Sequence, residues 1–219
     1  MRIRDRLGIS KHRQAQLAHV LQLCLVGFVF VGLYEGQLGV VVNAAVGLGV
    51  STLPAVLERD YGVPMDPALV LWVTLAVFLH ALGTVGVPGT GSFYGNVWWW
   101  DHLTHTLSSS VVAAAGYAAV RAIDEHTDAV YFPPAFLFVL LFVITLAFGV
   151  FWEIVEFAIS EVAALAGVTS VLTQYGVTDT MLDLLFDTAG ALVVAVGGTT
   201  YLSGVVDTLA ARLDARSEE

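Results

Sequence analysis

The chain has 219 residues, of which 57% are hydrophobic and only 13% are charged, whereas about a quarter of the residues of an average soluble domain are charged. This composition excludes an ordinary soluble protein and indicates an integral membrane protein. The formal net charge of -10, with 9 basic residues against 19 acidic ones, argues against nucleic acid as a partner because phosphate contacts need basic patches.

A single membrane domain over residues 1–219 is the simplest organisation, because we see no linker or low-complexity tract that would separate modules. The single cysteine, Cys24, lies in the first apolar segment, so the sequence predicts neither an internal disulfide nor a cysteine-based metal site. The excess of acidic residues resembles the composition of proteins from salt-adapted archaea.

About six apolar segments are long enough to cross the hydrocarbon core of a bilayer, for which a helix needs about 20 residues. Helices are expected because open strands in lipid leave backbone groups without hydrogen bonds. The expected spans are approximately 16–33, 38–57, 67–87, 97–120, 132–157 and 181–202. The sequence therefore predicts an all-α fold, a polytopic transmembrane helix bundle of the cell membrane with the lipid bilayer around it.

The basic residues predict the orientation of this bundle. With six spans, all of them fall on one side, which the positive-inside rule makes cytoplasmic, so both termini are expected there. They are Arg2, Arg4, Arg6, Lys11, Arg13, Arg59, Arg121, Arg212 and Arg216. The connections 34–37, 89–96 and 158–178 contain no Lys or Arg and are expected outside, where Trp98, Trp99 and Trp100 fit an aromatic belt.

Ionisable residues gather at the outer ends of the last three spans, and no Lys or Arg lies within those segments. They are Asp101, His102 and His105 at the start of the fourth span, Glu153 and Glu156 at the end of the fifth, and Asp179, Asp183 and Asp187 around the start of the sixth. A charge in the bilayer core costs roughly 2.5–3.5 kcal/mol, so protons, a bound cation or a water-filled cavity must compensate.

Helical spacing directs these side chains toward one place. Asp101, His102 and His105 share an arc of their helix, which Ser108 and Ser109 extend as a polar stripe. The two glutamates share a face as an i,i+3 pair, and the three aspartates are i,i+4 neighbours. We expect the three groups to meet in the outer half of the membrane.

The motifs in this chain resemble the YjdF-like family of multi-span inner-membrane proteins, from about Leu38 to the end of the sixth span. The similar segments are 54–59, 61–64, 93–94, 100–105, 151–157, 173–174 and 179–183. The resemblance implies a multi-span bundle with the same acidic and histidine positions, and no particular reaction. A more distant likeness to the VanZ-like membrane family rests on an Asp/His opening followed by later Glu, Gln and Asp positions.

Simpler interpretations stay open for each feature. Asp101 and His105 can form only an i,i+4 hydrogen bond, and the glutamates can be protonated contacts between helices. Asp179 can be no more than the N-cap of the sixth helix. His80, in the third span, can be a hydrogen-bonded residue of the bundle instead of a secondary metal ligand.

Among the functional interpretations, cation binding ranks first. Imidazole and carboxylate ligands without thiolate suit zinc, manganese or iron, so we expect a divalent metal ion held by the residues of the three groups. Such an ion would activate water beside a lipid or polyprenyl-linked substrate, with Glu153 and Asp183 as candidate catalytic residues. The sequence does not decide whether the protein is an enzyme.

Two other classes of function remain as alternatives. A proton- or cation-coupled transporter would exchange ions through the same carboxylates, although almost nothing ionisable lies in residues 111–120 and 137–151 to continue a pathway inward. In a non-catalytic structural subunit, the polar residues would only fix helix packing.

Overall fold

The computed structural model describes residues 9–217 except 88, 90, 128, 130 and 173. Arg2, Arg4, Arg6 and Thr173, which entered the arguments on orientation and resemblance, lie outside the described residues. The elements are α2 (Lys11–Glu35), α3 (Leu38–Tyr61), α4 (Pro67–Thr84), β1 (Gly86–Val87), β2 (Gly91–Ser92), α5 (Phe93–Asn96), α6 (Trp100–His126), α7 (Pro134–Ala166), α8 (Val177–Val193), the π-helix η1 (Val194–Gly198) and α9 (Thr199–Ser217).

The all-α polytopic architecture predicted from the sequence is confirmed. In the part of the chain that the structure describes, 6 helices are long and apolar enough to cross a membrane, at Lys11–Glu35, Leu38–Tyr61, Pro67–Thr84, Trp100–His126, Pro134–Ala166 and Val177–Gly197. The main difference lies in α7, which continues nine residues past the expected end at Phe157 to Ala166. The connection that follows α7 is therefore shorter than expected, 167–176 instead of 158–178.

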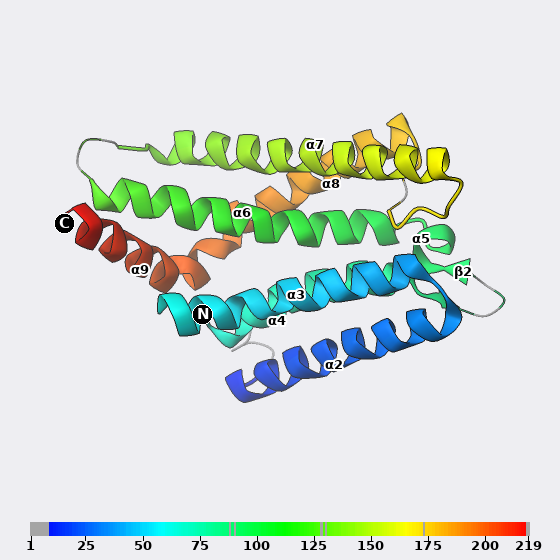
Figure 1. The fold of residues 1–219 in the computed structure, drawn as a ribbon. Coiled ribbons are helices and arrows are strands. Elements are labelled where there is room, and N and C mark those ends of the chain that lie inside the picture. The colour runs from blue at the N-terminus through cyan, green and yellow to red at the C-terminus, as the bar shows by residue number, and fades with distance from the viewer. Residues whose placement is uncertain are drawn as a thin grey trace.

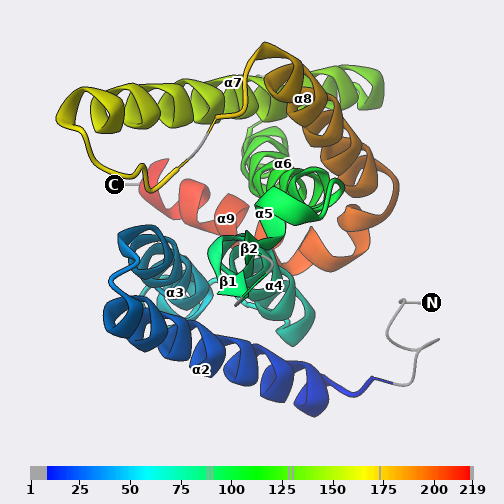
Figure 2. The same cartoon turned by 90° about the vertical axis from the view of Figure 1, so that its right-hand side faces the viewer.

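Local sequence explains where the helices begin and end. Asp66 accepts a hydrogen bond from the backbone N–H of Ala68, and Pro67 occupies the first turn of α4, where its missing N–H costs nothing. Gly36 and Gly167 end α2 and α7 in the left-handed conformation, which only glycine adopts readily. After α8 the chain passes through the wider turn of η1 and changes direction into α9 (Figure 2).

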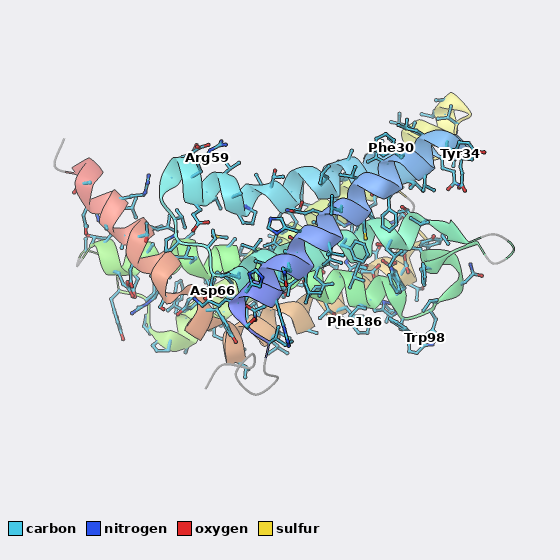
Figure 3. The ribbon with its side chains drawn as sticks, turned by 90° about the horizontal axis from the view of Figure 1, so that it is seen from below. Phe30, Tyr34, Arg59, Asp66, Trp98 and Phe186 are labelled. Carbon is cyan, nitrogen blue, oxygen red and sulfur yellow. The ribbon has the colours of Figure 1, made fainter. Side chains whose placement is uncertain are left out.

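Connections alternate between the two ends of the bundle (Figure 1). The β1–β2 hairpin, α5, the turn at 36–37 and the connection 167–176 lie at one end, which we call the hairpin end. Residues 62–66 and the C-terminus lie at the other. Figure 3 shows Tyr34 and Trp98 toward the hairpin end and Arg59 at the opposite end. Which end faces the cytoplasm stays a prediction.

The helices pack in two groups. Helices α2, α3 and α4 contact one another, as do α6, α7 and α8, and the contact of α4 with α6 joins the groups (Figure 2). Small residues bring the helices together, because Ala44 and Ala81 are fully buried with Leu25 in the first group, and Ala113 and Ala191 in the second. Large apolar side chains such as those on the outer faces of α2 and α7 are exposed, as expected where lipid surrounds the protein.

Candidate metal centre and its two cavities

Close packing of α6 against α8 positions the candidate centre. Gly190 of α8 lies against the backbone of α6, where an added Cβ would come within 2.5 Å of the carbonyl oxygen of Thr106 and 2.8 Å of the backbone nitrogen of Ser110. One turn earlier, the Thr106 hydroxyl donates to the carbonyl oxygen of Phe186 at 3.2 Å. This close approach brings the start of α6 within reach of the aspartates of α8.

Asp101, His105 and Asp183 form the most compact group of possible metal ligands among the described residues. One ligand atom from each lies within 4.8 Å of the others. The Nε2 atom of His105 is 3.7 Å from Oδ1 of Asp101. Zinc-class ions hold N and O ligands at about 2.0–2.2 Å, usually in tetrahedral geometry, which puts two ligands of one ion about 3.4 Å apart, so side-chain shifts of up to about 1 Å would close the set.

The second ring nitrogen of His105 is oriented by Asp187. The Nδ1 atom lies 3.3 Å from Oδ1 of Asp187, whose side chain is almost fully buried. In metalloproteins a ligating histidine usually donates its other N–H to a carboxylate, which fixes the ring and its tautomer. Asp187 can play that part here, leaving Nε2 directed toward Asp101.

On α6 and α8, two buried atoms of the candidate ligands lack hydrogen-bond partners among the described residues. They are Oδ1 of Asp183 and Nδ1 of His102, which lie 3.5 Å apart without the geometry of a hydrogen bond. The His102 ring stacks on Phe186, with centroids 4.3 Å apart and an interplanar angle of 5°. Asp183 is 1% exposed, so water does not satisfy its free oxygen from the surface. An unpartnered buried carboxylate oxygen is a signal for a bound ion or proton.

Glu153 lies in the same polar region on α7. Its Oε2 atom accepts a 2.7 Å hydrogen bond from Thr180, which in turn accepts one from the side-chain amide of Gln174. Its Oε1 atom is buried and has no partner among the described residues. The carboxylate interacts electrostatically with those of Asp101 and Asp183, so the α6, α7 and α8 groups are brought together as expected.

Glu156 and Asp179 lie closer to the hairpin end. Glu156 accepts a hydrogen bond of 2.9 Å from the indole N–H of Trp152. The expectation that Asp179 is the N-cap of its helix is wrong, because α8 begins at Val177 with Gly176 as its N-cap. Asp179 instead lies in the first turn and accepts a hydrogen bond of 3.4 Å from the backbone N–H of Tyr175. At this position its negative charge interacts favourably with the positive end of the helix dipole.

A polar cavity of about 610 Å³ lies at the hairpin end, and we call it the outer cavity. Its lining includes Asp101 and Glu156, together with His80, Tyr94 and Tyr175. Burial raises the pKa of the Tyr94 hydroxyl, and burial followed by the negative charge of Asp101 raises the pKa of Tyr175, so both phenols stay protonated hydrogen-bonding groups. The candidate catalytic residues Glu153 and Asp183 do not line this cavity.

A second cavity of about 390 Å³ runs between α3 and α7, and we call it the groove. Val42, Val46 and Val50 form one wall, and Phe148 and Trp152 lie on the other. Its floor comes from α4 and α6 and includes His105, while Asp187 of α8 also reaches it, so the groove extends from the candidate centre along the membrane-spanning helices. Figure 2 shows the two helix groups between which it lies, with the connection 167–176 bending from α7 toward α3 before it returns to α8.

His80 lies where the two cavities meet and lines both. Its Nε2 atom is 3.1 Å from Oδ1 of Asn43, and its Nδ1 atom is 2.8 Å from the hydroxyl of Tyr94. The Asn43 amide also donates to the carbonyl oxygen of Val171 at 2.8 Å and so ties the connection 167–176 to α3. The hydrogen-bonded interpretation of His80 is therefore confirmed, and both its ring nitrogens already have protein partners.

Sequence reasoning did not single out Asn43 or Thr180. The signal for Asn43 was available, since it is an isolated amide in an apolar span, and such a residue needs a partner inside the bundle. Thr180 gave no comparable signal, because a hydroxyl can satisfy itself on its own helix and its bond to Glu153 depends on how α7 and α8 pack.

Comparison with known proteins supports the membrane assignment. Residues 17–204 match the family described as "Predicted membrane protein (DUF2238)". The chain belongs to this family. It is also 31% identical, over 142 residues, to an "Uncharacterized protein" of Thermotoga maritima, an alignment that covers 65% of this chain and 67% of that protein. No solved structure matches.

The family that these comparisons identify carries neither of the two names expected from the sequence motifs. The YjdF-like name is not confirmed by them, and they show no relationship of this DUF2238 chain to the VanZ-like family. The archaeal origin suggested by the acidic composition stays a prediction.

Proposed function

We propose that this DUF2238 protein binds a divalent cation of the zinc, manganese or iron class through Asp101, His105 and Asp183. The observation that carries the proposal is made at Asp183: its buried Oδ1 atom has no hydrogen-bond partner among the described residues, and one of its carboxylate oxygens lies within 4.8 Å of a ligand atom from each of the other two residues. Mixed nitrogen and oxygen donors without sulfur suit these metals. Asp187 supports the set by holding Nδ1 of His105.

The other expected ligands have positions around this set. The Nδ1 atom of His102 and the Oε1 atom of Glu153 are buried without a hydrogen-bond partner in the described part of the chain, and we propose that these two residues support the site electrostatically without contacting the ion. Glu156 and Asp179 already accept hydrogen bonds from an indole and a backbone N–H. They are better suited to the electrostatics of the outer cavity than to ligation.

A cation at this place would supply Lewis-acid chemistry, which polarises a carbonyl or phosphoryl oxygen and makes water a nucleophile near neutral pH. We propose hydrolysis of an ester-type bond in a lipid-type substrate in the cell membrane. Water adds its hydroxyl to the acyl carbon, the acyl C–O bond breaks, and the proton goes to the leaving oxygen. Glu156 is better placed than Glu153 to take and return that proton, because it lines the outer cavity.

Metal binding by the detergent-purified full-length protein tests the proposal. We expect elemental analysis to give one zinc or manganese per chain, and chelator to lower the melting temperature, because a ligand that binds only the native state stabilises it by mass action. Asp183→Asn should abolish stoichiometric binding. Asp187→Asn should retain it with an affinity about 10–100-fold lower, as expected for a residue that orients a ligand without contacting the ion.

Two results would overturn the proposal. One is a wild-type protein that takes up neither ion from solution and melts at the same temperature with and without chelator. The other is an Asp183→Asn protein that binds zinc or manganese as tightly as the wild type. Either result would leave protons to neutralise the cluster, and the hydrolytic function would fall with the metal site.

A further inference from the structure

The groove and the outer cavity are neighbours, and the outer cavity is the more polar of the two. Both are lined by His80, Val171 and Leu172, so they meet at those residues. The groove continues from this junction between walls of valine and phenylalanine, whereas the outer cavity has carboxylates, hydroxyls and an amide in its lining beside leucines and valines. Their volumes of about 610 and 390 Å³ fall in the range of sites that hold small molecules.

The surroundings of the groove determine what can fill it. Its walls belong to α3 and α7, which are long and apolar enough to span the membrane. Val46 and Phe148 line the groove and are 59% and 46% exposed, so its contents are in contact with the medium around the protein. In a bilayer that medium is hydrocarbon, and a chain of methylene groups is the ligand whose chemistry matches these walls.

The charges of the outer cavity restrict the head group. Asp101 and Glu156 contribute carboxylates, and the described residues that line the cavity include no Lys or Arg. Hydrogen-bonding groups are available from Gln37, Ser92 and Tyr94. The proposed cation offsets the charge of Asp101, its ligand, so the carboxylate that stays uncompensated is that of Glu156. Because like charges at close range repel, Glu156 favours a head with hydroxyl or amide groups over a phosphate or carboxylate.

We propose that the groove binds one hydrocarbon chain of a lipid whose head group carries no negative charge and occupies the outer cavity. The ester-type bond between head and chain then lies at the junction, beside His105 and Asp101, which face the groove and the outer cavity respectively. The inference deepens the proposed function and rests on it for the reaction. The place of the chain rests on the groove alone.

Photolabelling of the full-length protein in detergent tests this site. The probe is a monoacylglycerol with a diazirine in the middle of its chain, and the readout is labelling of peptides that contain Val112, on the floor of the groove. We expect saturable labelling, which Val46→Trp reduces at least fivefold by filling the groove. Val139→Trp is the matched control, because Val139 is 56% exposed on α7 and does not line the groove. It should label like the wild type.

Two further arms separate the parts of the proposal. Lysophosphatidate with the same diazirine chain should label at least fivefold less than the monoacylglycerol at equal concentration. Asp183 lines neither cavity, so the Asp183→Asn protein should lose metal and keep the labelling. Failure of the metal site therefore does not imply failure of the site for the hydrocarbon chain.

Several outcomes would overturn the inference. Labelling that never saturates excludes a chain in the groove. So does labelling that stays within twofold of the wild type in both Val46→Trp and a second wall variant, Val50→Trp. Equal labelling by the two probes excludes the selection against an anionic head. Circular dichroism and size-exclusion chromatography of each variant confirm that it is folded before it is scored.

Discussion

Replacing Gly190 by alanine tests the contact between α6 and α8 on which the whole candidate centre depends. The added Cβ would lie 2.5 Å from the carbonyl oxygen of Thr106 and 2.8 Å from the backbone nitrogen of Ser110. The Ser109 hydroxyl lies closer still and can rotate away, but these two contacts are with backbone atoms, so the two helices must move apart. Such overpacking typically costs about 1–3 kcal/mol.

The control for this change is Gly49→Ala on α3. Apart from its chain neighbours and the nearby backbone of its own helix, Gly49 has no described heavy atom within 4 Å of the position that a Cβ would occupy. Alanine there should gain about 0.5–1 kcal/mol of helix stability, and the same gain is part of the effect at Gly190. The difference in unfolding free energy between the two variants therefore isolates the overpacking, about 1–3 kcal/mol to the disadvantage of Gly190→Ala.

Reversible unfolding in mixed micelles, followed by circular dichroism, measures this difference, and the same samples report on the metal site. Moving α8 away from α6 separates Asp183 and Asp187 from His105, so Gly190→Ala should also weaken zinc binding. A Gly190→Ala protein that is as stable as the Gly49→Ala protein and binds zinc with unchanged affinity would refute this reasoning. In that case α6 and α8 do not approach closely at Gly190, and this contact does not position the candidate centre.

Two other predictions concern the charge of the cluster and its side of the membrane. Glu153→Gln should keep the hydrogen bond from Thr180 and remove a buried carboxylate, so the melting temperature should stay the same or rise. Chelator should still lower the melting temperature of this variant. If it no longer does so, Glu153 is a ligand. Val168→Cys in a Cys24→Ser background should react with an impermeant maleimide in intact cells, because the connection 167–176 is predicted to lie outside. Reaction only after permeabilisation would reverse the orientation.

The fold was predictable from the sequence because the bilayer imposes it. An apolar segment of about 20 residues has helix as its only satisfactory state in lipid, so six spans followed from hydropathy alone. The first and last residues of the helices were less predictable where a helix is amphipathic or extends beyond the hydrocarbon core of the bilayer. The extension of α7 to Ala166 includes Glu161, which hydropathy places outside the span although helical propensity lets the helix continue to Gly167.

The polar residues of the site were also visible, since charges in apolar helices are conspicuous, but their pairing was not. The sequence places Asp183 and Asp187 on one side of a helix, and only the contact at Gly190 decides that Asp187 reaches Nδ1 of His105 while Asp183 lies beside His102. The groove had no sequence signal either. It exists because α3 and α7 belong to different packing groups, which is a property of the assembled bundle.

The arrangement of the unpartnered atoms favours a cation over plain helix packing. A polar contact that served only to join helices would leave its oxygens hydrogen bonded, since each buried group without a partner costs about 1–3 kcal/mol. Asp183 and Glu153 each keep a buried oxygen without a hydrogen-bond partner among the described residues, although the net stability of a typical protein amounts to only about 5–15 kcal/mol. One proton neutralises one carboxylate, whereas one divalent ion would attract Asp101, Asp183 and the Nε2 atom of His105 at the same time. The hydrogen bond between Asp187 and Nδ1 directs that nitrogen toward the carboxylates before any ion arrives, and this preorganisation is what a metal site requires and a packing contact does not.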